Sequence, residues 1–224
     1  MYSEIMTREF LGRSTSASSV TYSNLSVNVG DLLVILTSNF DFEVLNSFSV
    51  SSTNMGTITW TEITQTRNND GTKQTRGSII YGVVASTTTT GTLTIDCARG
   101  YVFSEVHKFI DHNGVGGKGT VSSDVGDGGT ISLTLDAAPA SSDVTIAHVL
   151  HHTYNSSASL VPGTGYVEIF EFLADQRDGQ TQYRENSTST ACTWALTSSG
   201  AQGEVGVAIV VKAAENFANF FFFL

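Results

Sequence analysis

The most chemically capable residues of this 224-residue chain form a histidine-rich stretch, His148-Val149-Leu150-His151-His152. Successive side chains of a strand point to opposite faces, so His148 and His152 would share one face and His151 would lie on the other. Two histidines on one face can begin a metal site, but a zinc site needs three or four ligands, and the sequence suggests no third ligand nearby. We therefore expect no metal, and we interpret these histidines as partly exposed residues near a strand end.

Two glutamates, Glu168 and Glu171, are the best carboxylate pair for glycoside hydrolysis. That reaction needs two carboxyl groups that flank one glycosidic bond. A spacing of three places Glu168 and Glu171 on opposite faces of a strand. We therefore interpret them as solvent-facing charges or as guards of a sheet edge.

Other motifs resemble known sites without matching them. The glycine-rich stretch 114–120 has Gly119 between its lysine and its threonine, and predicted strands follow it in place of the helix that a phosphate-binding loop needs. The acidic stretches 124–128 and 175–179 lack the spacing of a calcium loop, and turns favour Asp and Gly for conformational reasons. No Gly-x-Ser-x-Gly motif is present. We predict that the chain is not an enzyme and uses no cofactor.

The elements that must position any site are short apolar stretches. Residues 32–36 are five consecutive apolar side chains, and residues 143–150 repeat this character. Such runs are typical of strands that are buried on both faces. Residues 57–63 alternate with a period of two, as a half-buried strand does. The sequence predicts an all-β fold, a jelly-roll-like antiparallel β-sandwich.

The predicted strands repeat in order along two halves, at about residues 19–112 and 130–212. An ancient duplication would explain this order, and so would the symmetry of the two interlocked Greek keys of a jelly roll, which we slightly favour. We expect a glycine-rich surface connection at 113–129, an irregular N-terminal arm at 1–18 and an apolar C-terminal arm at 213–224.

Composition narrows the possible partners. Eleven basic and 21 acidic side chains give a net charge of −10, which argues against nucleic acid, since phosphate affinity comes mostly from Lys and Arg. The sequence has no apolar run of about 18 residues that would span a membrane, and we expect no signal peptide at the N-terminus. Cys97 and Cys192 each fall in a predicted strand and are expected to be buried thiols; the sequence leaves a disulfide between them open.

The least ordinary feature is the apolar C-terminal segment, whose candidate partner-binding residues are Phe217, Phe220, Phe221, Phe222, Phe223 and Leu224. Four consecutive phenylalanines carry roughly 600–1,000 Å² of surface, at or above the 300–600 Å² of the largest apolar patch on a typical monomer. The segment's own domain, a neighbouring subunit or lipid must cover it. We favour a neighbouring subunit, hence a homo-oligomer or other protein partners, because the segment follows a complete set of strands and is free to reach outward. Lipid is the least favoured cover, since the nine residues 216–224 cannot span a bilayer and no basic residues flank them to help binding to a membrane.

The predicted strand cores and turns together resemble a known group of proteins. The resemblance lies in residues 30–34, 60–63, 70–71, 91–95, 143–146 and 165–166, and it spans about residues 20 to 212. Residues of these types in this order resemble the jelly-roll, lectin-like sandwich proteins found as virion components of tailed bacteriophages. The resemblance implies a virion structural protein with a role in head decoration, tail or fibre and without catalytic residues, and within this group we favour a capsid decoration or minor capsid protein. The alternative is a tail or fibre component that binds carbohydrate or a receptor, for which Tyr154, Tyr183 and Trp194 are the candidate sugar-stacking residues.

Overall fold

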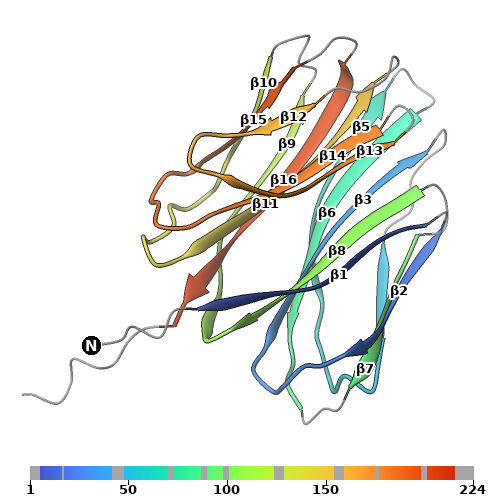
Figure 1. Cartoon of the computed structure of the whole chain (residues 1–224), viewed down its shortest axis with the longest axis vertical. Helices are drawn as coiled ribbons and strands as arrows, with labels where there is room; N and C mark the ends of the chain where they lie inside the picture. Colours follow the sequence, from blue (N-terminus) through green and yellow to red (C-terminus); the bar gives the residue numbers. More distant parts are fainter. Residues whose placement is uncertain are drawn as a thin grey trace, which may run out of the picture.

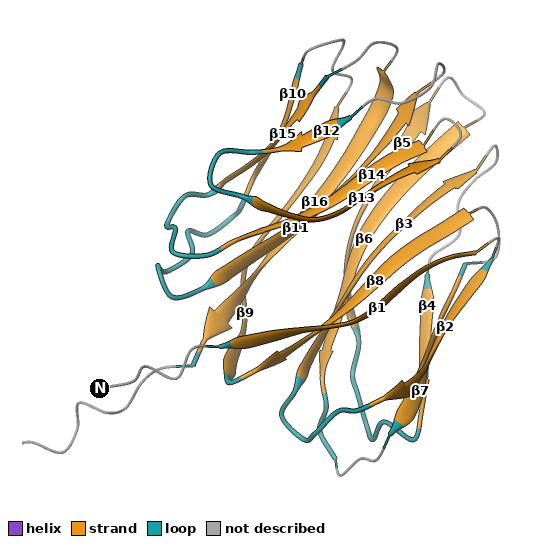
Figure 2. Cartoon of the chain, in the orientation of Figure 1, coloured by secondary structure: helices purple, strands orange, loops and turns teal. Residues whose placement is uncertain are grey.

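All regular structure in the described part of the chain is β-strand. The computed structural model describes residues 6–16, 18–41, 48–69, 73–86, 90–97, 101–123, 129–153, 159–174, 177–197 and 201–214. Within these ranges there is no helix, and the strands pair in antiparallel fashion (Figure 2). The predicted all-β sandwich class is confirmed. The strands are β1 (Thr7–Ser16), β2 (Ser19–Leu25), β3 (Leu32–Asp41), β4 (Ser49–Thr53), β5 (Thr61–Asn69), β6 (Lys73–Val83), β7 (Gly91–Asp96), β8 (Tyr101–Ile110), β9 (His112–Ser123), β10 (Thr130–Thr134), β11 (Val144–Thr153), β12 (Leu160–Pro162), β13 (Val167–Ala174), β14 (Arg177–Arg184), β15 (Ala191–Leu196) and β16 (Ala201–Ala213).

The strands form four sheets, two in each half of the chain (Figure 1). The first half has a five-stranded sheet in the order β1-β8-β3-β6-β5 and a three-stranded sheet in the order β2-β7-β4. The second half has a five-stranded sheet in the order β13-β14-β11-β16-β9 and a three-stranded sheet in the order β10-β15-β12. If eight is added to each strand number of the first half, its sheets become β9-β16-β11-β14-β13 and β10-β15-β12. These are the sheets of the second half, the larger one read from its other edge, so the strand order is the same in both halves. The jelly-roll assignment and a common origin of the halves stay predictions.

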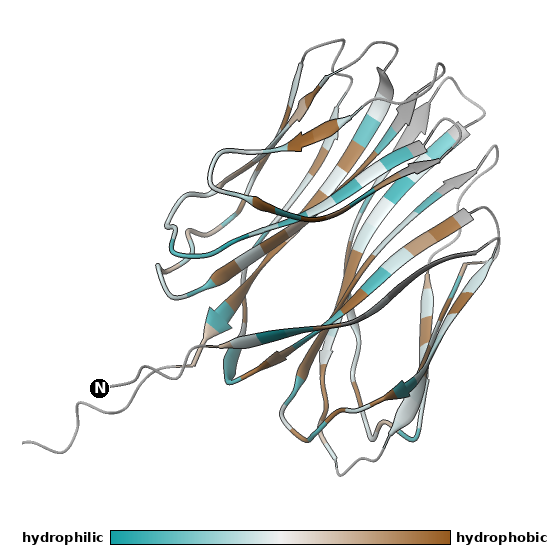
Figure 3. Cartoon of the chain, in the orientation of Figure 1, coloured by the Kyte–Doolittle hydropathy of each residue, from teal (hydrophilic) through white to brown (hydrophobic). Residues whose placement is uncertain are grey.

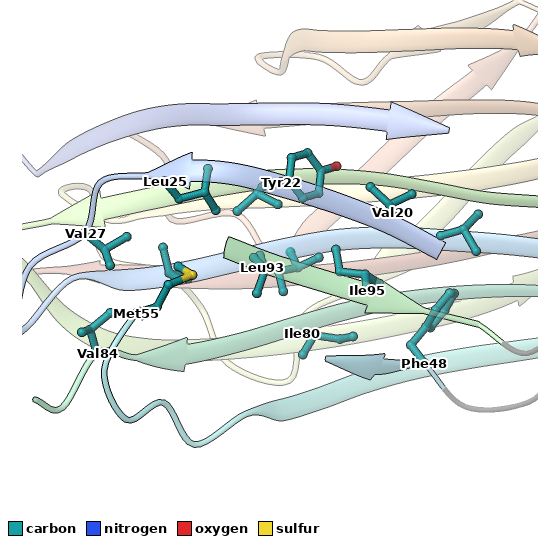
Figure 4. Packing of buried hydrophobic residues seen from close by; sticks show 14 of the residues in the cluster. Val20, Tyr22, Leu25, Val27, Phe48, Met55, Ile80, Val84, Leu93 and Ile95 are labelled. Carbon is teal, nitrogen blue, oxygen red and sulfur yellow. The ribbon is translucent and has the colours of Figure 1, made fainter. Parts of the chain in front are cut away.

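Three large apolar clusters and one small one, formed by Leu150, Val205 and Phe172, hold these sheets together. One fills the first sandwich, between its two sheets, and includes Leu93, Ile95 and Met55 (Figure 4). A second fills the second sandwich around Trp194. The third, which we call the central cluster, joins the two five-stranded sheets and includes Phe109 of β8 and Ile209 of β16. The molecule is therefore four layers deep, with the five-stranded sheets inside.

This layering explains the two kinds of strand in the sequence. Leu33 and Ile35 of β3 lie in the first sandwich, whereas Leu32, Val34 and Leu36 lie in the central cluster. An inner strand buried on both faces must be apolar at successive positions. The outer strand β10 instead alternates between exposed and buried residues. Figure 3 shows hydrophobic bands that recur along inner strands such as β16.

Both inner apolar strands are preceded by the same aspartate-closed turn. The backbone N–H of Asn28 donates to Oδ2 of Asp31 at 2.7 Å, and that of Ala140 donates to Oδ2 of Asp143 at 2.8 Å. Oδ1 of Asp143 also accepts the backbone N–H of Ala213 at 3.1 Å. The turns align Asp31 with Asp143, so that each residue of β3 has an equivalent 112 positions later in β11.

Substitution of these aspartates should have unequal effects. We expect Asp143→Ala to lower the free energy of unfolding by about 2–3 kcal/mol and Asp31→Ala by about 1–2 kcal/mol, because a buried hydrogen bond to a charged group contributes about 1.5–3 kcal/mol and Asp143 accepts one more such bond in the described structure. Urea unfolding of the two variants measures the difference. Equal losses would contradict the role of the Ala213 contact.

Two segments differ from the sequence interpretation. Residues 7–16 of the expected irregular arm form β1, which pairs along its length with β8. Most of the expected surface connection at 113–129 lies in β9, which pairs with β16. A Cβ at Gly117 would lie 2.3 Å from the carbonyl oxygen of Ala137, and one at Gly119 would lie 2.5 Å from Leu133. These glycines therefore permit a close approach of the chain and do not mark a loop.

The two cysteines lie in different sandwiches. Cys97 belongs to the first apolar cluster and Cys192 to the second, and both are buried free thiols. The expectation of buried thiols is confirmed, and the disulfide that the sequence left open is absent.

Both ends of the described chain lie beside the junction of the halves. The single residue Asp111 separates β8 from β9 and has a positive φ of 58°. Thr7 pairs with Ile110, and the backbone N–H of Ala214 donates to the carbonyl of Asp111 at 3.2 Å. The N-terminal end of β1 and the C-terminal end of β16 accordingly lie on the same side of the molecule, at the left in Figure 1.

Candidate functional site

The main concentration of buried ionisable groups between the two sandwiches lies beside the central cluster. We call this group the seam cluster. Its members come from four strands of the two facing sheets, and each side chain points between those sheets. The seam cluster consists of Phe103, Glu105 and His107 of β8, His148 of β11, Thr181 of β14 and Phe172 of β13.

These side chains point into the seam because successive side chains of a strand point to opposite faces. On β8, Val102 and Val106 lie in the first sandwich, so the odd-numbered residues face the other way. Phe109, also odd-numbered, packs in the central cluster. Glu105 and His107 thus lie on the same strand face as two phenylalanines. The sequence shows that ionisable and aromatic residues alternate on this face of β8. It does not show that the face is buried, and only burial of the ionisable residues indicates a candidate site.

Aromatic contacts connect the two sandwiches at the seam. The ring of Phe103 lies 4.4 Å from that of Phe172 and 5.6 Å from that of His148, and it is nearly parallel to both, at 20° and 12°. Phe170 stacks on Phe103 at 5.7 Å. Nδ1 of His148 lies 3.0 Å from the hydroxyl of Thr181. One ring of the first sandwich therefore contacts three rings of the second.

The ionisable groups of the seam are fully enclosed. Nε2 of His107 lies 3.6 Å from Oε2 of Glu105, and neither side chain is exposed. Burial lowers the pKa of His148 to about 4, and the nearby carboxyl of Glu105 acts in the opposite direction. Nε2 of His148 is buried and has no hydrogen-bond partner among the described residues. The seam therefore favours the neutral form of His148.

The rim of the seam is apolar and borders two sheet edges. Phe10 of β1 is 45% exposed, and its ring lies 5.5 Å from that of His107. The guanidinium of Arg8 lies 4.1 Å above the ring of Tyr183. Val167 of β13 pairs with Tyr183 and is 52% exposed. Within the described structure, β1 and β13 each pair on one side only, so both rim strands present an open edge.

The histidines differ from the sequence interpretation. His148 and His151 are both fully buried, so the prediction of partly exposed histidines is wrong for these two. The cause is that an inner sheet is covered on both faces. His151 faces the interior of the second sandwich, where its Nε2 lies 3.8 Å from Oε1 of Glu204, and Ser123 donates to the other oxygen of Glu204 at 2.9 Å.

A β-bulge changes the interpretation of the two glutamates. The pairing of β13 with β14 shifts between Glu168 and Phe170, so Glu168 lies opposite Gln182 and Glu171 lies opposite Gln180. An extra residue in a strand reverses the alternation beyond it. Glu168 and Glu171 thus share a face, and the predicted opposite orientation is wrong.

These carboxylates hold the edge of a neighbouring strand. Glu171 accepts the backbone N–H of Leu160 at 2.7 Å, and the side-chain amide of Gln180 donates to the carbonyl of Leu160. The same amide donates to Glu168 at 3.0 Å. Leu160 begins β12, which is an edge strand of its sheet. Glu171 and Gln180 therefore attach a three-stranded sheet to a five-stranded one, and Glu168 holds the amide of Gln180 within the five-stranded sheet.

The candidate sugar-stacking residues do not form one surface. Trp194 is fully buried in the second sandwich, because alternation along β15 points Cys192, Trp194 and Leu196 inward. Trp194 therefore lacks the exposed position that stacking on a sugar requires. Tyr183 is partly buried against the central cluster beneath Arg8. Tyr154 lies outside the described residues.

The partner-binding residues predicted for the C-terminal segment, Phe217 and 220–224, lie outside the described residues. The described ranges contain no group of three or more His, Cys, Asp or Glu side chains arranged to hold a metal ion. No helix among them is long and apolar enough to cross a membrane.

Comparison with known proteins gives no relative from which to transfer a function. No protein-family model, no curated protein and no solved structure matches the chain.

Proposed function

We propose that this protein is a non-enzymatic virion structural protein, a capsid decoration or minor capsid protein, that binds neighbouring subunits through its terminal segments. The proposal rests on the sequence resemblance to virion proteins of tailed bacteriophages and on the arrangement of the chain ends. Its partners are other virion proteins and further copies of the same chain.

The observation that carries the proposal is the convergence of the two chain ends beside Asp111. Residues 1–5 and 215–224 adjoin these two chain ends in the sequence and lie outside the described residues. The second of them holds the six apolar residues that need a cover. A protein whose two described chain ends lie close together can attach to a surface through both of its terminal segments.

The open edges of β1 and β13 supply a second means of contact. An unpaired strand edge can accept another strand through backbone hydrogen bonds. Phe10 and Val167 add exposed apolar surface on these two strands. Carbohydrate binding is the weaker candidate function. Trp194 is fully buried, and the guanidinium of Arg8 already covers one face of the Tyr183 ring.

Removal of the C-terminal apolar residues tests the contribution of this segment. We expect the full chain to sediment as an oligomer whose mass grows with concentration, and the variant that lacks residues 220–224 to sediment as a monomer with an unchanged circular dichroism spectrum. Analytical ultracentrifugation measures both masses. Replacing Val83 of β6 with serine in the full chain is the control, since Val83 is 41% exposed but lies on neither open edge, and this change should leave the mass of the oligomer unaltered. Identical masses for the full and shortened chains would contradict the proposal.

The virion assignment has a separate readout. Intact particles purified from the source of the sequence should contain this chain at a high copy number, which quantitative mass spectrometry measures. Recovery of the chain only in the particle-free fraction would overturn the assignment and would leave the self-association result untouched.

A further inference from the structure

We propose that the seam is a proton-sensitive joint, at which mild acid separates the two sandwiches along the β8 and β11 side while each sandwich keeps its own fold. This inference concerns regulation within the molecule and does not depend on the function proposed above. It starts from the enclosed position of His148 between two independently packed bodies.

The surroundings of His148 offer little to stabilise an added proton. Among the described residues of β8, the seam presents Phe103, Glu105 and His107. The other strands around His148 present uncharged side chains, apart from Arg8 at the rim, which stacks on Tyr183. These uncharged side chains are Leu36 and Ser38 of β3, Thr75 and Ile79 of β6, Phe170 and Phe172 of β13, Thr181 of β14, Val205, Val207 and Ile209 of β16, and Phe10 of β1. Glu105 is the sole carboxyl group in this set, and His107 already lies within 3.6 Å of it.

The direction of the pH effect follows from the protonation of His148. Its pKa is about 4 in the closed seam and 6.5 when water reaches the ring. Because the closed state has the lower pKa, it is fully favoured above pH 6.5 and becomes less favoured as the pH falls toward 4. A difference of 2.5 pH units raises the ratio of open to closed molecules by about 300-fold, after which the effect saturates.

Opening at the seam costs less than unfolding a sandwich. Each sandwich has its own apolar cluster, which the separation leaves intact. Phe170 and Phe172 are only partly buried, so the seam cluster borders solvent. One residue, Asp111, joins the halves in sequence, next to the central cluster. Separation can therefore begin at the seam cluster and pivot near Asp111.

The first half supplies a matched replacement for His148. The equivalent turns align His148 with Leu36, which occupies the same position on β3 and packs in the central cluster. His148→Leu therefore gives β11 the same residue that β3 has at the aligned position, Leu36. His148→Gln is a second variant that retains a hydrogen-bonding side chain for Thr181 and does not titrate.

Fluorescence energy transfer between the outer sheets measures the separation. Dyes that are insensitive to pH are attached to cysteines introduced at Ser51 of β4 and Ser132 of β10, both exposed, while Cys97 and Cys192 are buried and stay unlabelled. We expect transfer to fall between pH 6.5 and 4 and to recover on neutralisation, with the far-ultraviolet circular dichroism unchanged. In both His148 variants transfer should stay constant over this range.

His151→Asn is the control for the other buried histidine of β11, since the aligned residue in the first half is Asn39. This variant should open in acid as the unmodified chain does. The proposal is overturned if transfer in the unmodified chain does not change, or if the His148 variants open with the same pH profile.

Discussion

Replacement of Trp194 by alanine is expected to lower the free energy of unfolding by about 3–5 kcal/mol, the range for deleting a large aromatic side chain from a core. Trp194 is fully buried in the second sandwich, where it packs with Ile131 and Leu196. The cavity left behind cannot collapse easily, because the surrounding side chains belong to two sheets that are held at a fixed separation. Urea unfolding, followed by circular dichroism, measures the loss.

The chain contains a matched control for this change. Trp60 is only partly buried against the first apolar cluster, so Trp60→Ala should cost clearly less than Trp194→Ala. The comparison also separates two functions of Trp194. A sugar-stacking residue would lose glycan binding with little change in stability, so a Trp194→Ala variant with near-normal stability would contradict the buried position and revive the carbohydrate alternative.

Replacement of Phe109 by alanine is expected to uncouple the two sandwiches. Phe109 is fully buried in the central cluster, close to the junction at Asp111. Its loss should lower the free energy of unfolding by about 3–5 kcal/mol. The contacts that are lost are those between the two halves. We expect calorimetry to record one cooperative transition for the unmodified chain and two resolved transitions for Phe109→Ala.

Phe10→Ala provides the control, since Phe10 is 45% exposed at the rim. Its loss should cost under about 1 kcal/mol and leave a single transition, because exposed substitutions usually have small effects. A single transition for Phe109→Ala at a strongly lowered temperature would mean that the halves do not fold independently, and it would weaken the proposed joint as well.

The strand cores could be predicted because apolar runs and period-two alternation follow directly from which faces a sheet buries. Residues 32–36 and 143–150 are predicted as buried strands on this basis, and both stretches correspond to inner strands. The arrangement of the layers could not be predicted. The sequence of one strand does not reveal whether its second face meets solvent or another sheet, and this uncertainty made His148 and His151 look partly exposed.

Two errors arose from local patterns with two physical causes. Glycines such as those in 114–119 occur in flexible connections and also in strands that another part of the chain approaches closely. Gly117 and Gly119 lie in such a strand. The polar residues of β1 resemble an irregular arm, since an edge strand shields few of its side chains. Pairing with β8 is a long-range property that these residues do not encode by themselves.

The seam could not be predicted for a related reason. Glu105 and His107 lie on one strand, whereas His148 and Thr181 lie on two others, and only the packing of the inner sheets brings them together. The bulge in β13 was equally hidden, because an extra residue near Ile169 leaves no mark in composition. Spacing rules for Glu168 and Glu171 hold only while the alternation is unbroken.

The four-layer arrangement also determines where the backbone is best protected from solvent. Strand β3 lies between β8 and β6, strand β11 lies between β14 and β16, and apolar clusters cover both faces of each. Amide hydrogens in such strands exchange with deuterated water only through the largest opening of the molecule. The slowest-exchanging amides should therefore belong to β3 and β11, the two strands on either side of the central cluster, and the three-stranded outer sheets should take up deuterium first.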